Sequence, residues 1–317
     1  MTNIRTAPLF AERLARLRRV PTRPGASGAR KGDARLAWIL IFPSIVGFLV
    51  FAAYPTLRGF YLSFTNFRVF TPPEWVGFDN FIELAGDQKF WGSLGTTIYF
   101  VILTVILTMV LSVATAVILH RLTASTTIRS IVILPFLISN VVAAVVFSWM
   151  LDRQLGIVNI IIEALGGQSI GFLSERVWVV PTLAMITVWK TAGYTTILVF
   201  AGLQTIPPQI YEAGKLDGAT ETQMFRRLTL PLLRPIMAMV LVLTVIGAFQ
   251  VFDIVAVTTK GGPANASLVL QMYIYDKAFG QFDFGYASAM ALVLFLMLII
   301  ISFAQMRLLR ASESDQG

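Results

Sequence analysis

The sequence contains no cysteine and a single histidine, His120. Without cysteine the chain can form neither a disulfide nor a thiol nucleophile, and one histidine excludes almost every His/Cys metal site. The phosphate-binding pattern G-x-x-x-x-G-K-[ST] is also missing, so the chain cannot hydrolyse ATP by that route. We interpret His120 as structural, because it is predicted at the end of a helix, where a cation suits the helix dipole. We therefore expect this chain to bind no metal or cofactor of its own.

Charged residues are also scarce, at 13% of the chain, whereas apolar residues make up 56%. A helix needs about 20 mostly apolar residues to cross the hydrocarbon core of a bilayer. A very apolar soluble protein would alternate such stretches with amphipathic ones, and this sequence does not. We predict an all-α polytopic membrane protein with six membrane-spanning helices, with five or seven spans as the alternatives. The predicted spans are 36–57, 95–119, 131–150, 178–203, 236–258 and 286–306. Pro135 and Pro181 are expected to kink or open the third and fourth spans.

Basic residues are distributed unevenly about these spans. Residues 1–35 carry nine Lys/Arg and two acidic residues, and no small-residue cleavage site follows them, so the first span is predicted to be retained. We interpret this tail as a topology signal that contacts anionic lipid, rather than as a nucleic-acid-binding segment. With the N-terminus inside, 17 Lys/Arg fall on the cytoplasmic side and 7 outside. We therefore predict two cytoplasmic ends, 1–35 and 310–317, around one membrane domain at 36–309.

The loop at 204–235, between the fourth and fifth spans, is predicted to be cytoplasmic and ordered. Pro208 can occupy a first helical turn, where its missing N–H costs nothing. Asp217-Gly218 is a turn signal that ends this first short helix. Thr220 and Gln223 have capping-box spacing, which predicts that a second helix starts there. The expected result is a helix–turn–helix between two spans.

The residues of this loop resemble the "EAA" loop of permease subunits in bacterial ATP-driven (ABC) import systems. The family pattern is Glu-Ala-Ala, three residues, Gly, nine residues, Ile, one residue and Leu-Pro. Gly214 replaces the second Ala and Leu228 replaces the Ile. In that family the loop docks a separate ATPase, so the resemblance implies a coupling role for this loop. The residues it assigns to coupling are Glu212, Ala213, Gly214, Asp217, Gly218, Leu230 and Pro231.

Further motifs resemble the carbohydrate-uptake branch of this family, which includes the maltose and glycerol-phosphate permeases. Trp189-Lys190 begins 23 residues before Glu212. The other motifs are Val76-Gly77-Phe78-Asp79-Asn80-Phe81, Gly202-Leu203-Gln204-Thr205-Ile206-Pro207, Phe252-Asp253-Ile254 and Gly261-Gly262-Pro263. The resemblance implies a bacterial plasma-membrane permease for a sugar or sugar-like solute. Its implied partners are a second homologous permease, two copies of an ATPase that holds ATP and Mg, an external solute-binding protein and membrane lipid, with no nucleic acid.

Two charged residues, Lys190 and Asp253, fall within predicted spans. Because intramembrane charges are costly, such residues are candidates for a functional site. A mutual salt bridge that only pins two helices is the structural alternative. On the functional interpretation they face a polar path for the solute. The other candidates for this path are Trp189, Tyr194, Gln250 and Asn140.

Each of these candidates offers chemistry that suits a sugar. Trp189 has a flat apolar face for a sugar ring, while Lys190, Tyr194 and Gln250 can hydrogen-bond hydroxyls. The resemblance implies that Trp189 and Tyr194 match sugar-binding positions of the maltose-type permease. Asn140 is the weakest candidate, since a lone polar residue in a span more often joins helices.

Two other classes of function make different demands on the sequence. A self-sufficient secondary transporter or channel predicts several buried acidic or histidine residues for ion coupling, and only Asp253 is available. An intramembrane enzyme predicts clustered His, Asp, Glu or Ser groups at one depth, and none occur. The pattern therefore favours a non-enzymatic permease subunit.

Overall fold

A computed structural model describes residues 31–69, 71–122 and 125–310 of the chain. Within these residues the regular structure is helical, and strand pairing is limited to isolated bridges. The chain divides into two compact units, Met1–Arg58 and Gly59–Gly317. The predicted tails at 1–35 and 310–317 lie mostly outside the described residues, so their assignment stays a prediction.

The described part of the first unit is one nearly continuous helix. It comprises α2 (Lys31–Phe48), a π-helical turn (Leu49–Ala53) and the start of α3 (Tyr54–Leu62). The widened turn lies just before Pro55, which has no N–H to donate back into a regular α-helix. The segment Trp38–Leu62 is long and apolar enough to cross a membrane, as predicted for the first span.

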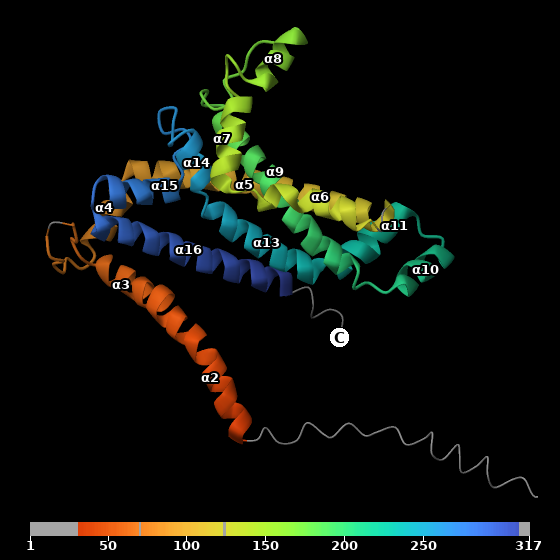
Figure 1. Cartoon of the computed structure of the whole chain (residues 1–317), viewed down its shortest axis with the longest axis horizontal. Helices are drawn as coiled ribbons and strands as arrows, with labels where there is room; N and C mark the ends of the chain where they lie inside the picture. Colours follow the sequence, from red (N-terminus) through yellow and green to blue (C-terminus); the bar gives the residue numbers. More distant parts are fainter. Residues whose placement is uncertain (1–30, 70, 123–124, 311–317) are drawn as a thin grey trace, which may run out of the picture. The chain divides into compact units, whose positions relative to one another are not determined.

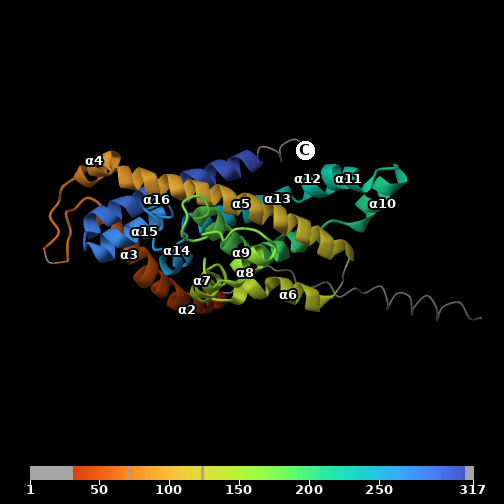
Figure 2. The ribbon, with the colours of Figure 1, turned by 90° about the horizontal axis from the view of Figure 1, so that it is seen from above.

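The second unit contains the remaining helices. The helices α5, α9, α13 and α16 run side by side along its length in both views (Figures 1 and 2). The long elements are α5 (Gln88–Leu122), α6 (Thr126–Leu137), α7 (Asn140–Met150), α9 (Val179–Leu203), α13 (Arg234–Phe249) and α16 (Phe284–Arg310). The short elements are α4 (Asp79–Gly86), α8 (Ile157–Ala164), α10 (Pro208–Leu216), α11 (Glu221–Met224), a π-turn (Phe225–Thr229), α12 (Leu230–Leu232), α14 (Asp253–Thr258), α15 (Leu270–Tyr275) and a second π-turn (Asp276–Gly280). We call its two ends the α4–α15 end and the α10–α11 end (Figure 1).

Among the described residues, five helices are long and apolar enough to cross a membrane, or six if one bent pair is counted as a span. That pair is α6 and α7, which meet at 89°. The predicted third span at 131–150 is broken, but the break lies at Ile138 and Ser139, which adopt extended conformations between α6 and α7, and not at Pro135. The α6 helix continues past Pro135 and ends only two residues later. The predicted kink at Pro181 is also wrong, since Pro181 lies in the first turn of α9, where no N–H is needed.

The fifth predicted span is interrupted as well. Helix α13 ends at Phe249, α14 begins at Asp253, and Phe252 between them has φ −140° and ψ −60°. The second unit therefore has two broken helical segments next to continuous ones. Interrupted helices at membrane depth are tolerated where they line a cavity or are buried in protein.

The apolar core of the second unit forms two clusters along the bundle. One includes Phe100, Leu183 and Phe249, and the other includes Leu119 and Leu203. On α5, α9 and α13 the stretch between the clusters carries most of the polar residues described below. The core thus leaves a polar layer between two apolar ones.

Helices α6 and α9 are in close contact beside this polar layer. A Cβ atom on Gly193 would lie 2.0 Å from the carbonyl oxygen of Val132, so α9 approaches the backbone of α6 directly. Small residues allow such close packing between membrane helices. On the other side of α9, the Ser112 hydroxyl of α5 donates to the Ala192 carbonyl at 3.0 Å.

At the α4–α15 end, one carboxylate joins three helices. Asp87 accepts hydrogen bonds from the hydroxyls of Tyr273 at 2.7 Å and Tyr286 at 2.8 Å, and it caps α5 by accepting from the N–H groups of Lys89 and Phe90. Burial raises the pKa of Asp87, but these hydrogen bonds lower it by more, so the pKa lies below its ordinary value. Burial and the bond to Asp87 raise the pKa of Tyr273. We call this set of bonds the Asp87 junction.

Candidate functional site

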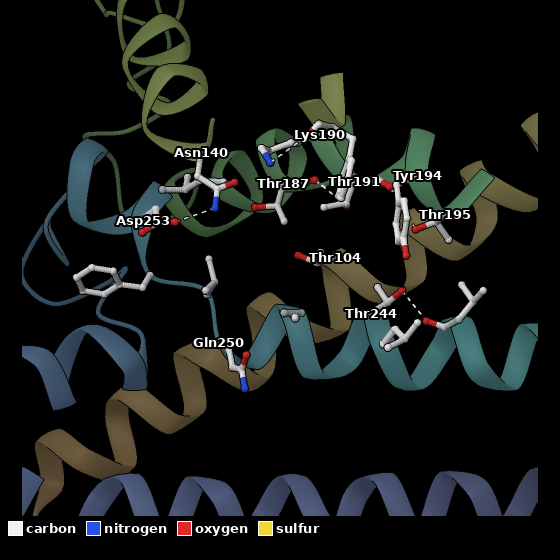
Figure 3. Close-up of a pocket in the computed structure, with 18 of the residues that line it drawn as sticks. Thr104, Asn140, Thr187, Lys190, Thr191, Tyr194, Thr195, Thr244, Gln250 and Asp253 are labelled. Carbon is white, nitrogen blue, oxygen red and sulfur yellow. Dashed lines mark hydrogen bonds between the residues drawn. The ribbon is translucent and has the colours of Figure 1, made fainter. Parts of the chain in front are cut away.

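The polar layer contains a cavity of about 270 Å³. It lies where α5, α6, α7, α9, α13 and α14 meet (Figure 3). Five of the six residues predicted for the solute path line it: Asn140, Lys190, Tyr194, Gln250 and Asp253. The remaining polar lining residues are Thr104, Thr187, Thr191, Thr195 and Thr244.

Both helix breaks open onto this cavity. Asn140 is the first residue of α7 and Asp253 is the first residue of α14, so each directly follows a break. The Asn140 side-chain N–H donates to the Asp253 carboxylate at 2.7 Å (Figure 3). A carboxylate at a helix N-terminus interacts favourably with the helix dipole. The hydrogen bond therefore joins the starts of two half-helices at the edge of the cavity.

Lys190 lines the same cavity but has a different partner. Its Nζ lies 3.5 Å from the carbonyl oxygen of Phe136 and 5.4 Å from the centre of that ring. Among the described residues, Lys190 and Asp253 form no ion pair. The salt bridge considered as the structural alternative is therefore absent here, because Asp253 bonds to Asn140 and the Lys190 side chain lies along α6.

Tyr194 follows Lys190 by about one turn on the same side of α9. Its ring stacks on Phe136, with centroids 4.5 Å apart and an interplanar angle of 14°. The stacked pair is partly exposed to the cavity, with Tyr194 at 37% exposure. Together the two rings form an apolar plate beside the Lys190 amine.

The structure adds threonines that the sequence analysis missed. The hydroxyls of Thr187, Thr191 and Thr195 each donate to a carbonyl one turn back on α9, which leaves their oxygen lone pairs available to a second group. These three recur every four residues, a helical spacing that could have been read as a polar stripe on an apolar helix.

Thr104 of α5 differs from these threonines. Its hydroxyl is buried and finds no hydrogen-bond partner among the described residues, and Thr104 lines the cavity (Figure 3). A buried polar group without a partner is costly and calls for an explanation, such as a ligand that supplies the bond. Thr108, one turn further along α5, is also buried without a partner, but it does not line the cavity.

Trp189 does not line this cavity. Successive residues of an α-helix point about 100° apart, so Trp189 and Lys190 cannot share one face of α9. The Trp189 ring packs edge-to-face on Phe147 of α7, with centroids 5.1 Å apart. The expectation that both residues face one path needs this correction, and the sugar-stacking role of Trp189 remains a prediction.

The loop at the α10–α11 end has the predicted helix–turn–helix form. Helix α10 starts with Pro208 at its first position, in agreement with the predicted place of this proline in a first helical turn. Gly218 has φ +73°, a left-handed conformation that glycine adopts without strain. The capping box is confirmed, because the Thr220 oxygen accepts from the Gln223 N–H and the Gln223 oxygen accepts from the Thr220 N–H.

Close contacts hold the two arms of this loop together. A Cβ on Gly214 would lie 3.2 Å from Leu228, so even an alanine here would require the Leu228 side chain to shift slightly. The hydroxyls of Tyr211 and Thr229 are 3.1 Å apart. Arg121, at the end of α5, pairs with Glu221 at 2.7 Å and so ties the loop to the longest helix.

The predicted coupling residues divide by exposure. Glu212, Ala213, Asp217 and Gly218 are exposed, while Leu230 and Pro231 are half-buried below the second arm. Among the described residues, Glu212 forms no ion pair. The exposed face of α10 therefore carries an acidic group that no other part of the described chain neutralises.

The described residues contain no cluster of three or more His, Cys, Asp or Glu side chains placed to hold a metal ion.

Known proteins share both the sequence and the fold. The family model for the binding-protein-dependent transport system inner membrane component matches residues 109–313. The sulfoquinovosyl glycerol transport system permease protein SmoG of Agrobacterium fabrum is 30% identical over 285 residues, which cover 89% of this chain and 92% of that protein. The trehalose/maltose transport system permease protein MalF of Thermococcus litoralis is 31% identical over 273 residues, which cover 86% and 92%.

A solved structure agrees with these relatives. One chain in the crystal structure of a bacterial ABC transporter involved in the import of the acidic polysaccharide alginate is 25% identical, with a TM-score of 0.79. The match covers 88% of this chain and 96% of that chain. The family match alone includes most of the cavity and the whole α10–α11 loop. This chain belongs to the family of binding-protein-dependent transport system inner membrane components.

Proposed function

We propose that this chain forms one wall of the solute path in an ATP-driven importer, and that the cavity between α5, α9 and α13 is part of that path. One observation carries the proposal: both broken helices open onto a cavity at the middle of the bundle. Discontinuous membrane helices mark solute sites in other transporters, where freed backbone groups and helix ends face the solute.

The lining of the cavity suits a sugar or sugar-like solute. Hydroxyl and amide groups surround it, and the Phe136–Tyr194 pair adds a flat apolar surface. Sugars present both hydroxyls and apolar ring faces, so a pocket for them combines polar groups with aromatic rings. The named solutes of the two relatives and of the alginate importer are also carbohydrates or carbohydrate derivatives.

The α10–α11 loop is proposed to dock a separate ATPase. Its exposed Glu212 would meet a basic residue of that partner, while Gly218 sets the angle between the two arms. The close contacts at Gly214 and Tyr211 make the loop stiff enough to move as one body. In this arrangement ATP and Mg bind to the partner, and this chain acts without a nucleotide site.

The proposed assembly contains this permease, a second homologous permease, two ATPase subunits and an extracytoplasmic solute-binding protein. A structural relative was solved in complex with a pentasaccharide-bound periplasmic protein, which supports the last of these partners. The chain would lie in a bacterial plasma membrane with both termini in the cytoplasm. The α10–α11 end then faces the cytoplasm and the α4–α15 end faces outward.

Thr104→Val tests the cavity. Valine has the shape of threonine without its hydroxyl, so the variant removes the unpartnered buried group and leaves the packing intact. We expect unchanged or slightly higher thermal stability, together with slower solute uptake by the reconstituted importer. Thr108→Val is the matched control, because it removes the same kind of group outside the cavity.

Equal transport by the two valine variants and the parent would place the solute path elsewhere in the molecule. Slower transport by both variants to the same degree would indicate a general effect on α5 and would also count against the cavity. Only a selective loss at Thr104 supports the assignment.

Gly218→Leu tests the loop separately. No atom lies within 4 Å of the position of a Cβ there, so the cost comes from backbone strain and not from a clash. A left-handed conformation costs about 1–2 kcal/mol for an ordinary residue, whereas asparagine tolerates it. We expect Gly218→Leu to abolish solute-stimulated ATP hydrolysis while the chain still inserts in the membrane, and Gly218→Asn to retain most of it. Normal coupling in the leucine variant would show that the loop is not the docking element.

A further inference from the structure

A second cavity lies at the α4–α15 end, between the starts of α5 and α9 and the turn at 264–268. Its volume is about 540 Å³. Lys89 and Arg176 are the charged residues that line it, and no carboxylate does so. We call it the Lys89–Arg176 groove. Uncharged polar side chains complete its lining: Gln88, Ser93, Thr96, Tyr99 and Asn265.

The acidic residues next to these two cations are engaged elsewhere. The Asp87 carboxylate bonds to the hydroxyls of Tyr273 and Tyr286 in the Asp87 junction. Glu175 pairs with Arg153 at 3.1 Å and accepts from the N–H of Gly171. Among the described residues, neither Lys89 nor Arg176 forms an ion pair. The groove therefore presents two cations that form no ion pair with a carboxylate of the described residues.

The Lys89 amine has a neutral neighbour instead. It lies 4.8 Å from the centre of the Tyr273 ring, which holds it at the mouth of the groove. Arg176 is exposed and precedes α9, whose first turn has no side-chain cap.

The groove continues into an apolar stripe along α5. From Tyr99 the same face leads to Ile102, Ile106 and Val110, which are 50%, 56% and 63% exposed. Their spacing of three or four residues keeps them on one side of the helix. The surface thus combines the two cations of the groove with a row of exposed apolar side chains along one helix.

Aromatic side chains lie at the same level. Trp91 of α5 and Trp178 before α9 are 56% and 42% exposed. Exposed tryptophan at the ends of membrane-spanning helices is typical of the boundary between headgroups and hydrocarbon. Both α5 and α9 are long and apolar enough to span the membrane, so the groove lies where a lipid headgroup would be.

We propose that the Lys89–Arg176 groove binds the phosphodiester headgroup of an anionic phospholipid, with an acyl chain along Ile102, Ile106 and Val110. Arg176 offers a planar pair of donors to the phosphate, and Lys89 adds a second charge. In the proposed orientation this lipid belongs to the outer leaflet. The inference needs only that the chain spans a membrane, so it stands or fails independently of the solute path.

The test uses the full-length chain, purified with the subunits it assembles with and placed in lipid nanodiscs. One set contains phosphatidylcholine alone and the other contains added phosphatidylglycerol, which has the same acyl chains and an anionic headgroup. The measurement is the melting temperature as a function of the phosphatidylglycerol fraction. We expect phosphatidylglycerol to raise the melting temperature of the parent with a saturable dependence.

The double variant Lys89→Gln, Arg176→Gln removes both charges. Its apparent affinity for phosphatidylglycerol should fall about 30-fold, since each surface cation contributes about a fivefold effect. Lys260→Gln, an exposed cation outside the groove, is the matched control and should behave like the parent. If the double variant fails to fold in phosphatidylcholine, Arg176→Gln alone should still show about a fivefold loss, because Arg176 has no ion pair to lose.

Three results would overturn the proposal. One is an equal melting temperature of the parent in both lipids. Another is an unchanged phosphatidylglycerol response in the double and the single variant. The third is full reproduction of the effect by soluble glycerol phosphate in phosphatidylcholine discs, which would make the groove a site for a free anion and not for a lipid.

Discussion

At the α4–α15 end one carboxylate joins three helices, whereas four threonine hydroxyls of the cavity bond only within their own helix. Asp87 accepts four hydrogen bonds that link α5, α15 and α16. By contrast, the threonines of the cavity donate to carbonyls one turn back. The first arrangement uses polar groups for cohesion, and the second leaves oxygen lone pairs facing an open space. Polarity inside this bundle therefore has two uses that hydropathy alone does not distinguish.

Close helix packing adds to the cohesion between α6 and α9 beside the cavity. The contribution of this packing to stability can be tested at Gly193, where an added Cβ would lie 2.0 Å from the Val132 carbonyl oxygen. The largest effect on stability is expected there. We expect Gly193→Ala to push α6 from α9 and to destabilise the fold by about 3 kcal/mol, the upper end for overpacking. Thermal unfolding in detergent measures this effect. Gly95→Ala, where no atom lies within 4 Å of the new Cβ, should be neutral or stabilising. A stable Gly193→Ala variant would mean that hydrogen bonds hold the cavity region after all.

Among the polar sites, substitution at the Asp87 junction should lower the free energy of unfolding the most. Asp87→Ala removes its four hydrogen bonds and leaves the hydroxyls of Tyr273 and Tyr286 without this acceptor. We expect a loss of about 2 kcal/mol in the free energy of unfolding. Tyr286→Phe removes one bond and should cost about 1 kcal/mol. Equal stability of parent and Asp87→Ala would show that the junction is not cohesive.

The same junction predicts how stability changes with pH. Because the pKa of Asp87 is below its ordinary value in the folded chain, its contribution is fully present above about pH 4. It is lost as the pH falls through the folded pKa, since protonation breaks the carboxylate bonds. The melting temperature of Asp87→Asn should therefore fall less than that of the parent below about pH 4. Parallel curves for the two proteins would contradict this assignment.

The smallest effect on stability is expected at the cavity edge. Asp253 is exposed and bonds to Asn140, and an amide can accept the same hydrogen bond. We expect Asp253→Asn to change stability by less than about 0.5 kcal/mol, as is usual for surface changes. Transport should nevertheless fall if the carboxylate faces the solute. A large loss of stability would show that Asp253 belongs with Asp87 as a structural group.

Much of this architecture was accessible from the sequence. The helical class, the positions of most spans and the capping box at Thr220 follow from local patterns that the structure retains. Asn140 and Asp253 were recognisable as polar residues in apolar stretches, but their pairing was not. Their contact depends on two helix breaks, and neither break is marked by a residue type that forbids a helix.

The errors have physical causes. Pro181 was expected to kink a helix, yet a proline in the first turn displaces no hydrogen bond. The third span was expected to open at Pro135, yet α6 continues to Leu137 and the extended residues are Ile138 and Ser139. Trp189 and Lys190 were both placed on the solute path, but successive helical residues point about 100° apart, and of the two only Lys190 lines the cavity.

The length of α5 has a mechanical consequence for the whole unit. Its 35 residues correspond to about 52 Å, against about 30 Å for the hydrocarbon core of a bilayer. This helix is unbroken from its start beside Asp87 to its end, where Arg121 pairs with Glu221 of the α10–α11 loop. By contrast, the helical segments α6–α7 and α13–α14 are interrupted at 138–139 and at 250–252. One continuous helix thus runs past two interrupted ones and connects the Asp87 junction directly to the α10–α11 loop.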